Sequence, residues 1–178
     1  MTPKDAGVLS PRRVLLIGMM GSGKTSVGRA VSERTGWPYR DNDEVLAEQE
    51  GMPTDELARR NGEQALRDAE SRALQALLKM EPPLIAGVAA GVVEVAEDRE
   101  RLAGPDAFVV YLHTPIEVLV ERVGSGEGRP WLQPDPEAAL RRLQEGREDH
   151  YRAAADLVVD SSTGDPDDHA AEIVAALA

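Results

Sequence analysis

The chain has 178 residues, of which 42% are hydrophobic, and this is enough for one domain with a sizeable core. Its formal net charge of -12 opposes binding to nucleic acid or to an anionic membrane surface, because either partner would repel it at long range. An anionic substrate would therefore need a local basic pocket. The sequence contains no cysteine, which excludes disulfides and thiol chemistry and is compatible with a reducing cytosol.

The N-terminal segment is polar and rich in Gly and Pro. It contains no apolar stretch of the kind found in signal peptides, and no run anywhere approaches the roughly 18 apolar residues of a membrane span. We therefore expect a cytoplasmic monomer without a membrane or nucleic-acid partner. The expected organisation is a flexible tail over residues 1–12 and a single domain over residues 13–178.

Short apolar runs alternate with longer segments of helical periodicity, which is typical of a parallel sheet covered by helices. The pattern predicts a three-layer α/β fold with a central five-stranded parallel sheet flanked by helices. A loop over residues 124–136, rich in Gly and Pro, is expected to form a short lid. The five strands are expected at residues 14–17, 37–41, 84–87, 108–112 and 156–160.

The stretch "GMMGSGKT", residues 18–25, follows the first strand and opens a helix. It fits the phosphate-binding pattern G-x-x-x-x-G-K-[ST], in which glycines turn backbone N–H groups toward an anion. Lys24 is expected to reach the β and γ phosphates, and the Thr25 hydroxyl to bind Mg²⁺. A chance glycine-rich turn is disfavoured by the flanking strand and helix. The motif predicts ATP and Mg²⁺ as cofactors and Gly21, Ser22, Gly23, Lys24, Thr25 and Ser26 as nucleotide-binding residues.

The stretch "RDND" places two carboxylates at the end of the second predicted strand. If Asp41 and Asp43 alternate along that strand, Asp41 faces the metal as a second magnesium ligand beside Thr25. Asp43 then reaches beyond the metal to a substrate hydroxyl. The alternative is that the two residues only cap the helix that follows.

Glu70 interrupts the apolar face of the next predicted helix, and Arg67 lies three residues earlier at the edge of that face. A partly buried Glu70 would hold the Arg67 guanidinium toward the carboxylate of a ligand. An exposed ion pair, with a stability contribution of about 0 to 1 kcal/mol, explains the spacing equally well.

Two further arginines stand out. Arg129 lies in the predicted lid, where it could close over phosphates. Arg147 follows Gly146 within a predicted helix over residues 136–155, and a kink at this glycine would turn Arg147 inward. Either arginine taken alone is more typical of an exposed surface charge. The small size of the chain favours a kinase of a small molecule over a GTPase or a motor.

Together these segments resemble the shikimate kinase family, small P-loop kinases of the nucleoside monophosphate kinase-like group. The resemblance rests on "GMMGSGKTSVGR", "DND", "GEQALRDAE", "GRPWL", "GREDHY" and "VDSSTGDP", in the order of the family. It implies phosphorylation of a hydroxyl of shikimate by ATP, in aromatic amino acid biosynthesis. It also implies that Lys24, Asp43 and Arg129 are catalytic, that Asp43, Arg67 and Arg147 contact the acceptor, and that Arg122 and Pro166 lie beside adenine.

The sequence departs from this family after the third predicted strand. Three consecutive glycines are expected there, but the chain has Val88, Ala89 and Ala90, and a β-branched valine disfavours the positive φ that glycine permits. Gly87 and Gly91 could instead supply the turn in a shifted register. Ala58 replaces a phenylalanine expected in the pocket, and Trp131 enlarges the lid. The alternatives to a shikimate kinase are a shikimate kinase-like or gluconate kinase-like enzyme for another polyol or cyclitol, and a non-catalytic ATP-binding module.

Overall fold

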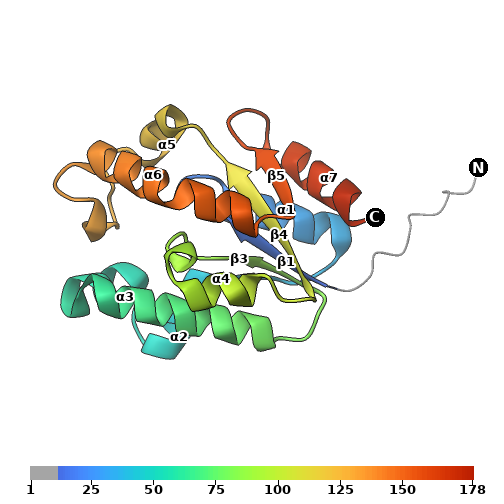
Figure 1. Cartoon of the computed structure of the whole chain (residues 1–178), viewed down its shortest axis with the longest axis horizontal. Helices are drawn as coiled ribbons and strands as arrows, with labels where there is room; N and C mark the ends of the chain where they lie inside the picture. Colours follow the sequence, from blue (N-terminus) through green and yellow to red (C-terminus); the bar gives the residue numbers. More distant parts are fainter. Residues whose placement is uncertain (1–11) are drawn as a thin grey trace, which may run out of the picture.

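The computed structural model describes residues 12–178, so the predicted tail lies outside the described residues except for Arg12. Its centre is a five-stranded sheet in the order β2-β3-β1-β4-β5, and every neighbouring pair is parallel (Figure 1). This confirms the predicted five-stranded parallel sheet. The strands are β1 (Arg13–Ile17), β2 (Tyr39–Asp41), β3 (Leu84–Gly87), β4 (Ala107–His113) and β5 (Leu157–Asp160).

Helices cover both faces of the sheet, because successive side chains of β1 point to opposite faces. Val14 and Leu16 pack with α1 (Lys24–Thr35) and α7 (Pro166–Leu177), which lie side by side in Figure 1. Leu15 and Ile17 pack in the second core, with the other helices. The predicted three layers are therefore present. The second group of helices is α2 (Asn42–Glu50), α3 (Thr54–Lys79), α4 (Ala96–Leu102), α5 (Ile116–Val123) and α6 (Pro136–Ala154).

The order of the strands reverses at β1, which lies between β3 and β4. In open α/β sheets, ligands bind beyond the carboxyl ends of the strands at such a reversal. The phosphate-binding motif follows β1 there, the start of α2 follows β2, and residues 88–91 follow β3. The topology therefore brings three of the predicted site segments to one edge of the sheet.

Two local predictions were wrong. β2 ends at Asp41, and the Asp41 Oδ1 atom accepts a hydrogen bond from the Asp43 N–H at 2.9 Å, so α2 begins at Asn42 and Asp43 lies in its first turn. The helix α6 also runs unbroken through Gly146, because one glycine costs only about 1 kcal/mol and the packing of a long helix outweighs it. The one break among the described helices is at Gly62 in α3, where φ is 87° and ψ is 175°.

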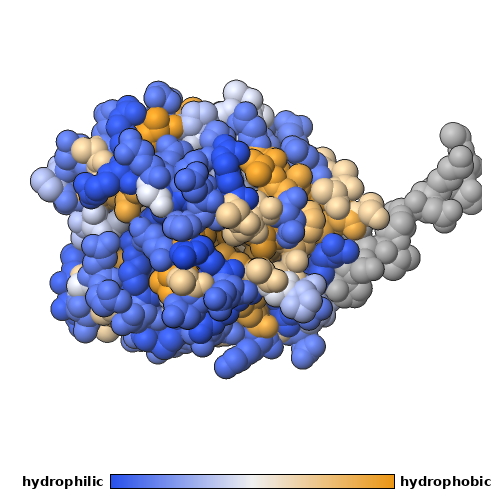
Figure 2. All heavy atoms as spheres, in the orientation of Figure 1, coloured by the Kyte–Doolittle hydropathy of each residue, from blue (hydrophilic) through white to orange (hydrophobic). Residues whose placement is uncertain are grey.

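The surface agrees with the acidic composition. The face shown in Figure 2 is mostly hydrophilic, with apolar side chains in separate patches. In residues 12–178, no helix has the length and hydropathy needed to cross a bilayer.

Candidate active site

A cavity of about 730 Å³ opens at the carboxyl edge of the sheet. Its walls come from the phosphate-binding motif, the first residues of α2, the middle of α3, residues 87–91 and the lid loop. Four cationic side chains line it, so an acidic chain gathers positive groups where an anionic substrate could bind: Lys24, Arg67, Arg129 and Arg147. The cavity also contains carboxylates, among them Asp41, Asp43 and Glu70.

The phosphate-binding motif has the geometry of an anion cradle. Gly18, Gly21 and Gly23 have φ values of 144°, 83° and 96°, a region that L side chains rarely adopt. A Cβ atom at Gly18 would also lie 2.8 Å from the Leu112 carbonyl oxygen. The helix α1 begins at Lys24 without a side-chain cap, so its first N–H groups remain available to a phosphate. The buried Ser22 Oγ atom likewise has no hydrogen-bond partner among the described residues.

Lys24 is held across the mouth of this cradle. Its Nζ atom donates to the carbonyl oxygens of Gly18 at 2.8 Å and of Met19 at 2.9 Å. Loss of hydration lowers the pKa of Lys24 from 10.5 to about 8, although the carboxylates of Asp43 and Asp41 act in the opposite direction. An anion that replaced the two carbonyl contacts would favour the charged ammonium.

Asp41 caps α2 and also faces Thr25. Its Oδ1 atom caps α2, and its Oδ2 atom accepts from the Thr25 hydroxyl at 3.1 Å and from the Tyr39 hydroxyl at 2.8 Å. In residues 12–178 no group of three or more acidic or histidine side chains could hold a metal. Mg²⁺ bound with a nucleotide needs only one or two protein ligands beside phosphate and water, so Thr25 and Asp41 fit such an ion.

Asp43 lies in the same cavity, accessible to the solvent of the cleft but enclosed by its walls. Its partial desolvation, followed by repulsion from Asp41, raises the pKa of Asp43 above that of an ordinary aspartate. Lys24 and Arg129 pull this pKa back down. A carboxylate of raised pKa that faces a cavity is suited to accept a proton from a bound hydroxyl.

Arg67 and Glu70 form a buried pair, and the alternative of an exposed ion pair is wrong. The Arg67 Nη1 atom donates to Glu70 Oε2 at 2.7 Å, and the two side chains are 13% and 8% exposed. Gly91 makes room for this arrangement, since a Cβ atom there would overlap the Arg67 guanidinium. Arg67 is thus fixed in orientation as it enters the cavity.

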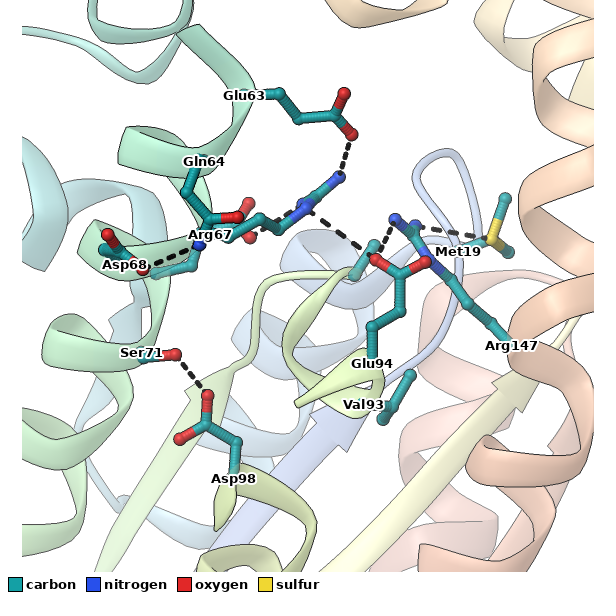
Figure 3. Close-up of polar contacts among 12 residues, drawn as sticks. Met19, Glu63, Gln64, Arg67, Asp68, Ser71, Val93, Glu94, Asp98 and Arg147 are labelled. Atoms are coloured by element: carbon teal, nitrogen blue, oxygen red, sulfur yellow. Dashed lines mark hydrogen bonds and ion pairs between the residues drawn. The ribbon is translucent and has the colours of Figure 1, made fainter. Parts of the chain in front are cut away.

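Arg147 is fully buried, so its alternative as a surface charge is also wrong. Its Nη2 atom donates to Glu94 Oε2 at 3.1 Å and its Nη1 atom lies 3.9 Å from the Met19 sulfur, while Nε has no partner among the described residues. One helical turn later, the Tyr151 hydroxyl donates to the Ala90 carbonyl oxygen at 2.6 Å. Arg67 and Arg147 therefore face the same space from opposite sides, one on α3 and one on α6 (Figure 3).

The lid and the loop after β3 close the cavity. Arg129 and Trp131 line it from the lid side, where residues 130–132 form a short 3-10 turn. Val88, Ala89 and Ala90 also line it, although Val88 is almost fully buried and packs in the core. No non-glycine residue in the described part of the chain has a positive φ, so Val88 is not strained. Ala58 packs against the core and does not reach the cavity.

Arg122 and Pro166 lie outside this cavity. Arg122 joins three segments, because its guanidinium donates to the carbonyl oxygens of Gly21 at 3.2 Å and of Ser161 at 2.9 Å. Pro166 is the exposed first residue of α7. Arg122 therefore lies beside the phosphate-binding turn, and neither residue lines the cavity that holds the predicted acceptor contacts.

Three residues that hydrogen-bond to residues of the cavity wall were not predicted from the sequence: Tyr39, Glu94 and Tyr151. Two of them carried a periodicity signal. Tyr39 precedes Asp41 by two residues and so shares its strand face, and Tyr151 follows Arg147 by four residues and so shares its helix face. Glu94 carried no such signal, because its position depends on the short 3-10 turn η1 (Val92–Glu94).

The chain was compared with known proteins. A family profile described as "Shikimate kinase" matches residues 20–178. A shikimate kinase of Salinispora tropica is 37% identical over 163 residues, which are 92% of this chain and 96% of the relative. One of Neisseria gonorrhoeae is 36% identical over 151 residues, which are 84% and 88% of the two chains. The solved shikimate kinase of Acinetobacter baumannii in complex with shikimate aligns with a TM-score of 0.89 at 30% identity, covering 95% of this chain and 94% of that one.

Proposed function

Because the chain belongs to the shikimate kinase family, we propose that it transfers the γ-phosphoryl group of ATP to a hydroxyl of shikimate, a reaction of aromatic amino acid biosynthesis. The family consists of phosphotransferases with an alcohol group as acceptor. The observation that carries the proposal is the meeting of a glycine-rich anion cradle and two inward-facing arginines in one cavity.

The donor end would hold the nucleotide. Backbone N–H groups of residues 21–26 bind the β and γ phosphates, and the Lys24 ammonium leaves the carbonyl oxygens of Gly18 and Met19 to join them. Thr25 and Asp41 would hold Mg²⁺, which would offset the negative charge of the phosphates. Arg122, which contacts Gly21 of the turn, and Pro166, at the start of α7, would flank the adenine.

The acceptor end would hold the sugar-like acid. The guanidinium groups of Arg67 and Arg147 would bind the carboxylate of shikimate. A planar guanidinium can donate two parallel hydrogen bonds to a carboxylate, so arginine suits this role. Asp43 orients the attacking hydroxyl toward the γ-phosphorus and takes its proton as the bond forms, consistent with its raised pKa. Arg129 closes over the γ-phosphoryl oxygens from the lid and shares their developing charge with Lys24.

Two further parts of the proposal follow. One chain by itself forms a cavity with both the anion cradle and the two arginines, so we propose a monomer as the active unit. A reaction that consumes ATP needs a nucleotide pool, which supports a cytoplasmic location.

The test is a coupled assay of ADP release with shikimate, quinate and gluconate as acceptors. Shikimate is expected to give the highest kcat/KM, by at least about tenfold. A phosphorylated product of quinate or gluconate at a higher kcat/KM would reassign the acceptor, and absence of turnover with all three would reject the proposed activity.

A further inference from the structure

Glu94 places a carboxylate between the two arginines of the proposed acceptor site. It rises from η1 into the space between Arg67 on α3 and Arg147 on α6 (Figure 3). Its Oε2 atom lies 3.1 Å from Arg147 Nη2 and 3.7 Å from Arg67 Nε. One oxygen within reach of both guanidinium groups occupies the position that a bridging carboxylate of a ligand would take.

All three nitrogens of Arg67 are already paired with carboxylates. Nη1 donates to Glu70 at 2.7 Å, Nη2 to Glu63 at 3.4 Å, and Nε faces Glu94. The second N–H of Nη1 and of Nη2 remains free among the described residues, so a carboxylate could approach Arg67 alone, but a carboxylate that also reaches Arg147 must take the space that Glu94 occupies. Glu70 is buried and is the carboxylate closest to Arg67, and Glu63 is 66% exposed and does not contact Arg147. A ligand that binds both arginines would therefore take the place of Glu94.

The backbone of Glu94 is fixed, while its side chain is partly exposed. The Glu94 N–H donates to the Gly91 carbonyl oxygen at 3.1 Å, and the neighbouring Val93 carbonyl oxygen accepts from Arg99 at 2.7 Å. Asp98 then ties α4 to Ser71 of α3. The Glu94 side chain is nevertheless 40% exposed, so it can rotate into water at little cost in solvation.

We propose that Glu94 is a built-in competitor for the acceptor's carboxylate: it bridges Arg67 and Arg147 in the free enzyme and swings out when the substrate binds. Glu94 thereby sets the affinity for the acid group of the acceptor without taking part in phosphoryl transfer. The inference rests on the proposed function, because it takes the two arginines as the acceptor's anion site.

The competing possibility predicts the opposite sign. If Glu94 instead holds the two arginines in position for the substrate, its removal lets them move and weakens binding. If it competes with the substrate, its removal frees both guanidinium groups and strengthens binding. The amide of Glu94→Gln keeps the size of the side chain and removes its charge, so this variant separates the two roles.

The experiment measures shikimate binding by calorimetry and turnover by ADP release, in wild type, Glu94→Gln, Glu63→Gln and Glu97→Gln. Glu63→Gln removes a partner of Arg67 that does not reach Arg147, and Glu97→Gln removes an exposed charge near the start of α4. We expect Glu94→Gln to lower the Kd and KM for shikimate about tenfold, with kcat and the KM for ATP within about twofold. Both controls should stay within about twofold of wild type.

An unchanged or raised Kd for shikimate in Glu94→Gln overturns the inference, and so does an equal fall in either control. The proposed function fails separately, if wild type binds shikimate without releasing ADP. Absence of shikimate binding in all four proteins rejects both.

Discussion

The two ends of the cavity are built in different ways. The donor end is a contiguous loop of backbone N–H groups, in which glycines at positive φ leave room for an anion and nothing has to be displaced except two carbonyl contacts of Lys24. The acceptor end consists of side chains from α2, α3, η1 and α6, with positive and negative groups already paired.

The comparison teaches where specificity can change. A main-chain cradle binds any polyphosphate and tolerates little variation, because its shape depends on backbone conformation. A site made of paired side chains changes its preference when one partner changes, because each carboxylate sets how free an arginine is. Variants at the donor end should therefore lower kcat with every acceptor. Variants at the acceptor end should change the KM for the acceptor and leave the KM for ATP nearly unchanged.

The largest effect is expected at the donor end, for Lys24→Met. The side chain keeps its length but loses the ammonium that shares the charge of the transferring group, so kcat should fall by about a thousandfold or more. Thermal unfolding should stay close to wild type, because the lost contacts are two hydrogen bonds to carbonyl oxygens that remain accessible to the cleft. ADP release measures kcat, and circular dichroism measures thermal unfolding. Wild-type turnover in this variant would contradict the role given to Lys24.

At the acceptor end, Arg147→Met should raise the KM for shikimate about a hundredfold and leave the KM for ATP within about threefold. Stability should not fall, because methionine fills a similar buried space and the partner left behind, Glu94, is 40% exposed and can be hydrated. Steady-state kinetics with each substrate varied, together with a melting curve, test this. An equal loss of ATP affinity would show that the two ends are not separable.

The difference between the two ends also decides what could be predicted from the sequence. The motif at residues 18–25 is local, so its residues and their backbone geometry could be predicted together. The burial of Arg147 could not be predicted in this way, because it depends on contacts with residues distant in the sequence, among them Met19 and Glu94. Asp43 was placed in the correct cavity but on the wrong element, because the cap formed by Asp41 starts α2 earlier than strand alternation suggests.

A smaller effect is expected from pH, which should change the affinity for ATP at the donor end more than the affinity for shikimate at the acceptor end. With the pKa of Lys24 at about 8 in the free enzyme, its ammonium is lost as pH rises through this value, so ATP binding must then return a proton to the amine. The affinity for ATP should therefore fall by up to about tenfold per pH unit above about 8, whereas the affinity for shikimate should change far less, since arginines keep their charge.

Calorimetry of ATP and shikimate separately between pH 7 and 9.5 measures both affinities. Lys24→Arg is the matched control, because a guanidinium stays charged over this range and should flatten the profile for ATP even if binding is weaker. An ATP affinity that is level up to pH 9.5 in wild type would mean that Lys24 keeps its ammonium throughout.

The smallest effect is expected for the loop after β3, in the double variant Ala89→Gly/Ala90→Gly. Since neither alanine has a positive φ, glycine brings no relief of strain and mainly increases the freedom of the unfolded chain, which costs about 1 to 2 kcal/mol of stability. The KM for shikimate should stay within about threefold. Ala58→Gly is the control, because it weakens a helix by a similar amount away from the cavity. A tenfold lower KM in the double variant alone would instead show that the two methyl groups narrow the acceptor end, and that this loop shapes the choice of acceptor.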